Sequence, residues 1–267
     1  MKFENTEVWG FEHALRGMRN PMNSWDKSDS KFGVCPIINK SDEDIDLSKE
    51  HISGLLGTFS GVKCYFANKA EYAMYTAIGE NDMSLGQKLI RAGSEHRKFM
   101  RQIFVSVDIT APLYWWKEFD TYKVGTVANS TSTMHKLATT PITIDCFETD
   151  DYDSNIMIEQ TLVYHERVSD MVACLIQPLE QLRQKYLETK DKKYWKELIR
   201  WLPESWLQTR TVTLNYENLL AMCSKGQRRF HKLNEWSGID NPTVPNFISW
   251  ARTLPYAHEL IFIDEVD

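Results

Sequence analysis

The stretch from Ile103 to His135 constrains the fold most, because it joins a strand, a proline turn, a helix and a polar run without a spacer. Apolar side chains mark alternate positions from Ile103 to Ile109, which predicts a strand with one buried face. Pro112 has no backbone N–H, so it ends that strand and suits the first turn of a helix expected to reach about Tyr122. A run rich in Asn, Ser and Thr follows.

Helical patterns dominate the rest of the chain. Asp82 or Ser84 is expected to cap a helix that reaches about Ala92. The longest pattern runs from Met157 to Leu187, and Pro178 is expected to kink or split it. Further helices are expected over Tyr194–Leu202, from Ser205 or Thr209 to about Cys223, over Gln227–Trp236 and over Val244–Leu260. Helices and strands do not alternate strictly, and neither repeats nor Gly/Ser linkers appear, so we predict an α+β fold in one domain over residues 1–267.

Bulk chemistry narrows the classes of function. The net charge is −6, so general nucleic-acid binding is not expected. The cysteines are widely spaced without a CxxC pair, which predicts no disulfide framework and a cytoplasmic location. The histidines form no HExxH or similar spacing, so no metal site is expected. No apolar run approaches the roughly 20 residues that span a bilayer, so no membrane association is expected.

Three anchors resemble the flavin-dependent thymidylate synthases, the ThyX family. The first is Ala111-Pro112 with its flanking strand and helix. The second is His96, which in the register set by Ala111-Pro112 falls on a family histidine that lies beside flavin and substrate. The third is Leu202-Pro203, followed twelve residues after the proline by Asn215 in a Thr-Leu-Asn word. The resemblance is clearest over about residues 82–236, and it implies a helix-rich fold with a small central antiparallel or mixed sheet.

Most of the charged residues of the family signature are replaced in this chain. Its Arg-His-Arg triplet falls on residues 121–123, where only Lys123 is positively charged. Its Phe-Glu-His word reads Met100-Arg101-Gln102, so an arginine stands at the position of the glutamate. The arginine two residues after the family asparagine is Glu217, a carboxylate expected to weaken attraction for a cofactor pyrophosphate. The signature's second serine falls on Thr131, a mild change.

The resemblance implies an enzyme that uses FAD to move a one-carbon unit from methylenetetrahydrofolate to C5 of a pyrimidine deoxynucleotide such as dUMP, with NADPH as reductant. The protein's part in such chemistry is mainly to hold and orient the ligands. A homotetramer is implied as well. A catalytically inactive nucleotide- or flavin-binding protein on the same scaffold, and a purely structural oligomer, remain alternatives.

The register assigns candidate site residues in three groups. They are His96 and Thr131 as catalytic residues, Tyr122, Lys123, Asn129 and Asn215 as cofactor-binding residues, and Ser130, Ser132, Arg228 and Arg229 as substrate-binding residues. Each also has a structural interpretation. The hydroxyl run suits a helix cap or a solvated loop, His96 a hydrogen-bonded structural histidine, and Tyr122 a core position. Asn215 suits a polar helix contact, while Lys123 and the basic patch around Arg228 suit solvated surface.

Overall fold

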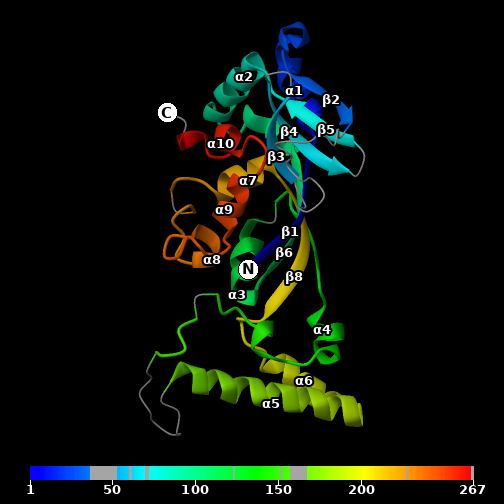
Figure 1. Cartoon of the computed structure of the whole chain (residues 1–267), viewed down its shortest axis with the longest axis vertical. Helices are drawn as coiled ribbons and strands as arrows, with labels where there is room; N and C mark the ends of the chain where they lie inside the picture. Colours follow the sequence, from blue (N-terminus) through cyan, green and yellow to red (C-terminus); the bar gives the residue numbers. More distant parts are fainter. Residues whose placement is uncertain are drawn as a thin grey trace, which may run out of the picture. The chain divides into compact units, whose positions relative to one another are not determined.

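The computed structural model describes residues 1–36, 53–59, 62–69, 72–122, 124–150, 152–156, 167–226 and 228–265 (Figure 1). The chain forms two compact units. The first unit comprises Met1, Thr110–Asp120 and Asn129–Arg210, and the second comprises Lys2–Ile109, Thr121–Ala128 and Thr211–Asp267. The expectation of one domain over the whole chain stays a prediction.

One four-stranded sheet supplies strands to both units. Its order is β1 (Lys2–Trp9), β6 (Phe104–Pro112), β8 (Leu207–Asn215) and β7 (Val127–Ser130). The predicted alternation in β6 is confirmed, since Val105, Val107 and Ile109 are buried. The predicted turn and helix follow as α3 (Leu113–Phe119) and the 3-10 turn η4 (Asp120–Tyr122).

Strand β8 corrects the helix that we expected to open at Ser205 or Thr209. Thr209, Thr211 and Thr213 alternate with the buried Val212 and Leu214, and β-branched residues in a period of two favour a strand. Only the last part of the expected segment is helical, as α7 (Tyr216–Met222). Asn215 therefore lies at the junction between a strand and a helix.

The second unit also contains a four-stranded antiparallel sheet that the sequence patterns did not predict. Its order is β2 (Lys31–Pro36), β5 (Tyr72–Ala77), β4 (Val62–Lys69) and β3 (Ser53–Phe59). The helices of this unit are α1 (Phe11–Arg19), α2 (Glu80–Arg91), α7, α8 (Asn234–Ser237), α9 (Phe247–Arg252) and α10 (Ala257–Leu260), with the 3-10 helix η3 (Arg97–Gln102). Buried aromatic side chains fill its core, among them Tyr216, Trp236, Phe247 and Phe262.

Several helix boundaries in this unit differ from the predictions. Helix α2 begins after Gly79, where the Asp29 carboxylate accepts hydrogen bonds from the N–H groups of Asn81 and Asp82. The expected cap Asp82 instead lies inside the helix, where its side chain is buried and binds Arg19. Within the expected Gln227–Trp236 helix, the described residues form turns that lead into the short α8. The expected Val244–Leu260 helix is divided into α9 and α10 around Pro255.

The first unit is mainly helical. Its elements after α3 are α4 (Thr133–Lys136), η5 (Leu137–Thr139), η6 (Ile144–Cys146), α5 (Val168–Thr189) and α6 (Lys192–Arg200). Helix α5 continues through Pro178, so the expected split does not occur, and residues 157–166 of the predicted helix lie outside the described residues. Leu179 and Leu198 pack with Leu137, Ile142 and Phe147 as the core of this unit. None of the helices in the described ranges combines the length and apolar character needed to cross a membrane.

Candidate functional site

Tyr122, Arg228 and Trp236 form an aromatic and cationic group that we call the Tyr122 cluster. The guanidinium carbon of Arg228 lies 4.7 Å from the centre of the Tyr122 ring. The ring centres of Trp236 and Tyr122 are 5.6 Å apart, as are those of His231 and Trp236. Tyr122 and Arg228 are half-buried. The structure thus brings together a residue predicted to bind cofactor and a residue predicted to bind substrate, in a cation–π arrangement.

Val124 and Gly125 lie against the start of helix α7. The Asn215 side chain accepts a hydrogen bond from the Asn218 N–H at 3.0 Å, and the Asn218 side chain accepts one from the Asn215 N–H at 3.2 Å. Asn218 Nδ2 also donates to the Val124 carbonyl at 2.7 Å. Gly125, at φ +81°, lies so close that an added Cβ would meet Asn215 Nδ2 at 3.2 Å.

Asn215 therefore acts as a helix cap, which is one of the two interpretations that the sequence left open. Its cofactor-binding role stays a prediction. Lys123, which immediately precedes this turn, lies outside the described residues.

Glu217 is paired with two arginines from η3. Its carboxylate accepts hydrogen bonds from Arg97 Nε at 3.2 Å and from Arg101 Nε and Nη2. Partial burial alone would raise the pKa of Glu217, but the hydrogen bonds from Arg101 and Arg97 outweigh it and hold the pKa below the ordinary value.

The pair joins two residues that the expected register marks as departures from the family signature. That register sets Arg101 on a glutamate and Glu217 on an arginine. In this chain Arg101 and Glu217 bind each other, so both departures lie in one ion pair. The charge of Glu217 is balanced by Arg97 and Arg101, and its expected effect on a cofactor pyrophosphate stays a prediction. Sequence reasoning missed this pair, although both departures were visible.

His96 lies in the turn between α2 and η3, directly before Arg97. Its backbone N–H donates to the Gly93 carbonyl at 3.0 Å, and its side chain is exposed. Gly93 adopts φ +106°, a conformation that suits glycine at the end of a helix. The imidazole is thus presented on the surface beside the arginines that bind Glu217. Its catalytic role stays a prediction.

Arg229 differs sharply from its neighbour Arg228. Its side chain is 7% exposed and donates to the Cys223 carbonyl at 3.0 Å and 3.2 Å. It also forms ion pairs of 2.7 Å with Asp264 and with Glu265. The geometry ties Arg229 to the C-terminal segment, so it favours Arg228 as the arginine that meets a substrate.

The polar run in the first unit forms strand β7 and the residues that follow it. Asn129, Ser130 and Thr131 are exposed, and Ser132 is half-buried. Backbone atoms of Thr131 are held by β8, since its N–H donates to the Thr209 carbonyl at 2.9 Å and its carbonyl accepts from Gln208 Nε2 at 3.0 Å. These side chains therefore lie at the end of a strand whose backbone is hydrogen-bonded to β8, and most of them face solvent. Their ligand roles stay predictions.

Comparisons with known proteins place the fold but not the family membership. Neither a family model nor a curated protein sequence matches this chain. A flavin-dependent thymidylate synthase ThyX from Helicobacter pylori, complexed with FAD and dUMP, matches with a TM-score of 0.54 and 13% identity over 99% of both chains. A second structure of ThyX from that organism, also with FAD and dUMP, gives a TM-score of 0.53 over 99% of this chain and 98% of that one.

These likenesses cover nearly the whole chain, and at 13% identity they show the fold alone. The predicted fold class is confirmed: the chain has the α+β fold of the flavin-dependent thymidylate synthases, rich in helix and with a small antiparallel sheet.

Proposed function

We propose that this protein is a divergent flavin-dependent thymidylate synthase-like enzyme that methylates C5 of a pyrimidine deoxynucleotide, with dUMP as the first candidate. One observation carries the proposal. The chain matches, over 99% of its length, the fold of a protein that was solved in complex with FAD and dUMP. The proposal extends to a homotetrameric, cytoplasmic protein, as the family resemblance implies.

The Tyr122 cluster supports a ligand that has a planar ring and an anionic group. The Tyr122 ring offers a stacking surface, and the guanidinium of Arg228 beside it offers charged hydrogen bonds. Flavin and pyrimidine nucleotides both combine these chemical groups, so the residues present fit FAD. Bound FAD would pass reducing equivalents from NADPH to the carbon supplied by methylenetetrahydrofolate.

The chain's own residues would then bind and orient. Arg228 would pair with a ligand phosphate, and Tyr122 would stack on a ring. Glu217 would keep Arg97 and Arg101 fixed beside His96. His96 would hold or move a proton, because imidazole is a common general acid or base and this side chain is exposed.

The residues at the end of β7 have roles that rest on the register alone. Thr131 would offer a hydroxyl where the family has a serine, Ser130 and Ser132 would donate to a phosphate, and Asn129 would bind cofactor. Their exposure supports contact with a ligand.

The direct test is product analysis. The protein is incubated with FAD, NADPH, methylenetetrahydrofolate and dUMP, and dTMP is measured by chromatography. His96→Ala and Thr131→Ala are expected to lower turnover, and Thr189→Ala on the exposed end of α5 serves as the control. Binding of FAD or dUMP without any C5-methylated product would favour the inactive binding protein on the same scaffold.

A further inference from the structure

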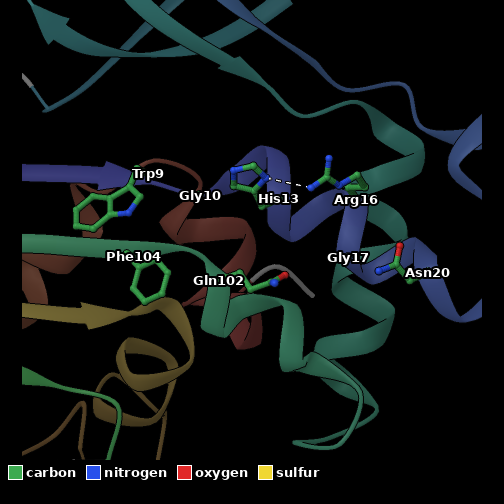
Figure 2. A pocket seen from close by; sticks show the side chains of 8 residues that line it. All are labelled: Trp9, Gly10, His13, Arg16, Gly17, Asn20, Gln102 and Phe104. Atoms are coloured by element: carbon green, nitrogen blue, oxygen red, sulfur yellow. Dashed lines mark hydrogen bonds between the residues drawn. The ribbon is translucent and has the colours of Figure 1, made fainter.

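A cavity of about 560 Å³ opens in the second unit, and none of the candidate catalytic, cofactor-binding or substrate-binding residues lines it. It lies where the end of β1, helix α1, the end of η3 and the start of β6 come together (Figure 2). Its lining residues are Trp9, Gly10, His13, Arg16, Gly17, Asn20, Gln102 and Phe104. The volume falls within the range of about 300–1,000 Å³ that is typical of small-molecule sites.

One wall of the cavity is aromatic. Trp9 and Phe104 stack with ring centres 5.8 Å apart and an angle of 23° between their planes. They remain 44% and 36% exposed, which is unusual for a pair of large aromatic side chains. In Figure 2 the two rings lie at one side of the group and Arg16 and Asn20 at the other, with His13 and Gln102 between them. A third planar ring could extend this stack.

The other wall is polar and positively charged. Arg16 is exposed on α1 and lies 3.3 Å from His13 Nδ1 through its Nη2 atom. Asn20 uses its side-chain oxygen to accept from Trp25, and Gln102 lies between the helix and the aromatic pair. Arg19, one turn further, is buried against Asp82 and contributes no charge here. Arg16 therefore supplies the positive charge among the lining residues.

Two glycines create the space. Gly10 adopts φ +97°, and an added Cβ would lie 2.0 Å from the Gln102 carbonyl oxygen. Gly17 is inside α1, where glycine costs helix stability, and an added Cβ would lie 2.7 Å from Gln102 Oε1. A side chain at residue 17 would enter the cavity.

From this geometry we propose that the cavity binds a small planar aromatic anion, with the ring on Trp9 and Phe104 and the phosphate or carboxylate on Arg16. The site goes beyond the proposed function and does not rest on it, since none of the Tyr122 cluster residues lines the cavity.

Calorimetric titration of the full-length protein with four probes tests the site. AMP carries a ring and a phosphate, indole-3-carboxylate a ring and a carboxylate, adenosine a ring alone, and inorganic phosphate an anion alone. At least one of the two aromatic anions is expected to bind more tightly than both adenosine and phosphate. The tighter of the two identifies the anionic group that the site prefers.

Substitutions then locate the binding. Arg16→Gln is expected to weaken it by roughly tenfold or more, as loss of a charged hydrogen bond does. Trp9→Leu is expected to weaken it by roughly fivefold or more, through loss of stacking. Gly17→Leu is expected to abolish binding, because its side chain would displace that of Gln102 and enter the cavity, and a thermal melt checks that the variant stays folded. Lys88→Gln, which removes one charge from exposed α2, is the matched control.

Three results would overturn the site. The first is wild-type affinity for both aromatic anions no greater than for adenosine or phosphate. The second is an equal effect of Arg16→Gln and Lys88→Gln. The third is a loss of binding with Arg228→Gln but not with Arg16→Gln, which would place the ligand at the Tyr122 cluster.

Discussion

At the scale of single residues, the ion pair between Arg101 and Glu217 joins two positions that differ from the family signature. Position by position, an arginine for a glutamate and a glutamate for an arginine both resemble loss of a site. The hydrogen bonds between the two residues show that the opposite charges at these positions bind each other in this chain. The two differences from the signature are therefore best judged together.

A double charge reversal tests whether Arg101 and Glu217 stabilise the fold by binding each other. Arg101→Glu places a carboxylate against Glu217, and Glu217→Arg places a third cation beside Arg97 and Arg101, so each single change is expected to lower the thermal midpoint. The double variant restores opposite charges and is expected to recover most of the loss. Losses that simply add in the double variant would show that the two residues do not interact.

The same carboxylate predicts a pH dependence. The pKa of Glu217 is held below its ordinary value of 4.5, so its contribution to stability is present above that value and is lost as pH falls through the folded-state pKa. The difference in thermal midpoint between wild type and Glu217→Gln is therefore expected to be larger at pH 7 than below about pH 4. A difference that stays constant across this range would exclude the ionised carboxylate as its cause.

Arg228 and Arg229 are adjacent in the chain but are expected to respond to mutation in different ways. Arg228→Ala should weaken dUMP binding by about 1.5–3 kcal/mol, the loss of a charged hydrogen bond, with little change in stability. Arg229→Ala should mainly lower stability, because it leaves Asp264 and Glu265 without their buried partner. Calorimetry with dUMP and thermal melts of both variants check this, and weaker binding by a fully stable Arg229→Ala variant would support its predicted substrate role.

At the scale of elements, the sequence predicted β6, the turn at Pro112, α3 and the existence of most helices. It failed where two periodicities compete. Residues 207–215 carry β-branched side chains in a period of two, but Ser205 or Thr209 is also a suitable cap for one helix that continues to about Cys223. A polar helix contact of Asn215 is one of the two interpretations from the sequence, whereas the Arg101–Glu217 pair could be found only from the three-dimensional contact.

The contact between α1 and α2 gives a prediction of its own. Asp82 is fully buried on α2 and accepts from Arg19 on α1 at 2.6 Å and from Ser28 at 2.6 Å. Asp82→Ala would leave Arg19 buried without its carboxylate, so the free energy of unfolding is expected to fall by about 3–5 kcal/mol. Asp26→Ala, at an exposed position in the same region, should stay within about 0.5 kcal/mol of wild type. Urea denaturation measures the free energy of unfolding of both variants. Equal losses in the two variants would contradict a stabilising role of the buried ion pair between Arg19 and Asp82.

At the scale of the whole molecule, two chains can share a fold although the residues of a family signature differ between them. The match to ThyX covers 99% of this chain at 13% identity. Burial of alternate apolar positions, caps and turns maintain such a fold, and many different sequences satisfy them. Ligand contacts instead require particular side chains in a particular geometry, so the candidate site is the part of this account that the experiments address.

The measurement that tests the central claim most directly is the visible absorption spectrum of the protein after FAD is added and the excess removed, with and without dUMP. The proposed function predicts a retained flavin band, and a shift of that band when dUMP binds beside the ring. A protein that keeps no flavin under either condition, while remaining folded by its thermal melt, would contradict the proposal that this chain still performs flavin chemistry.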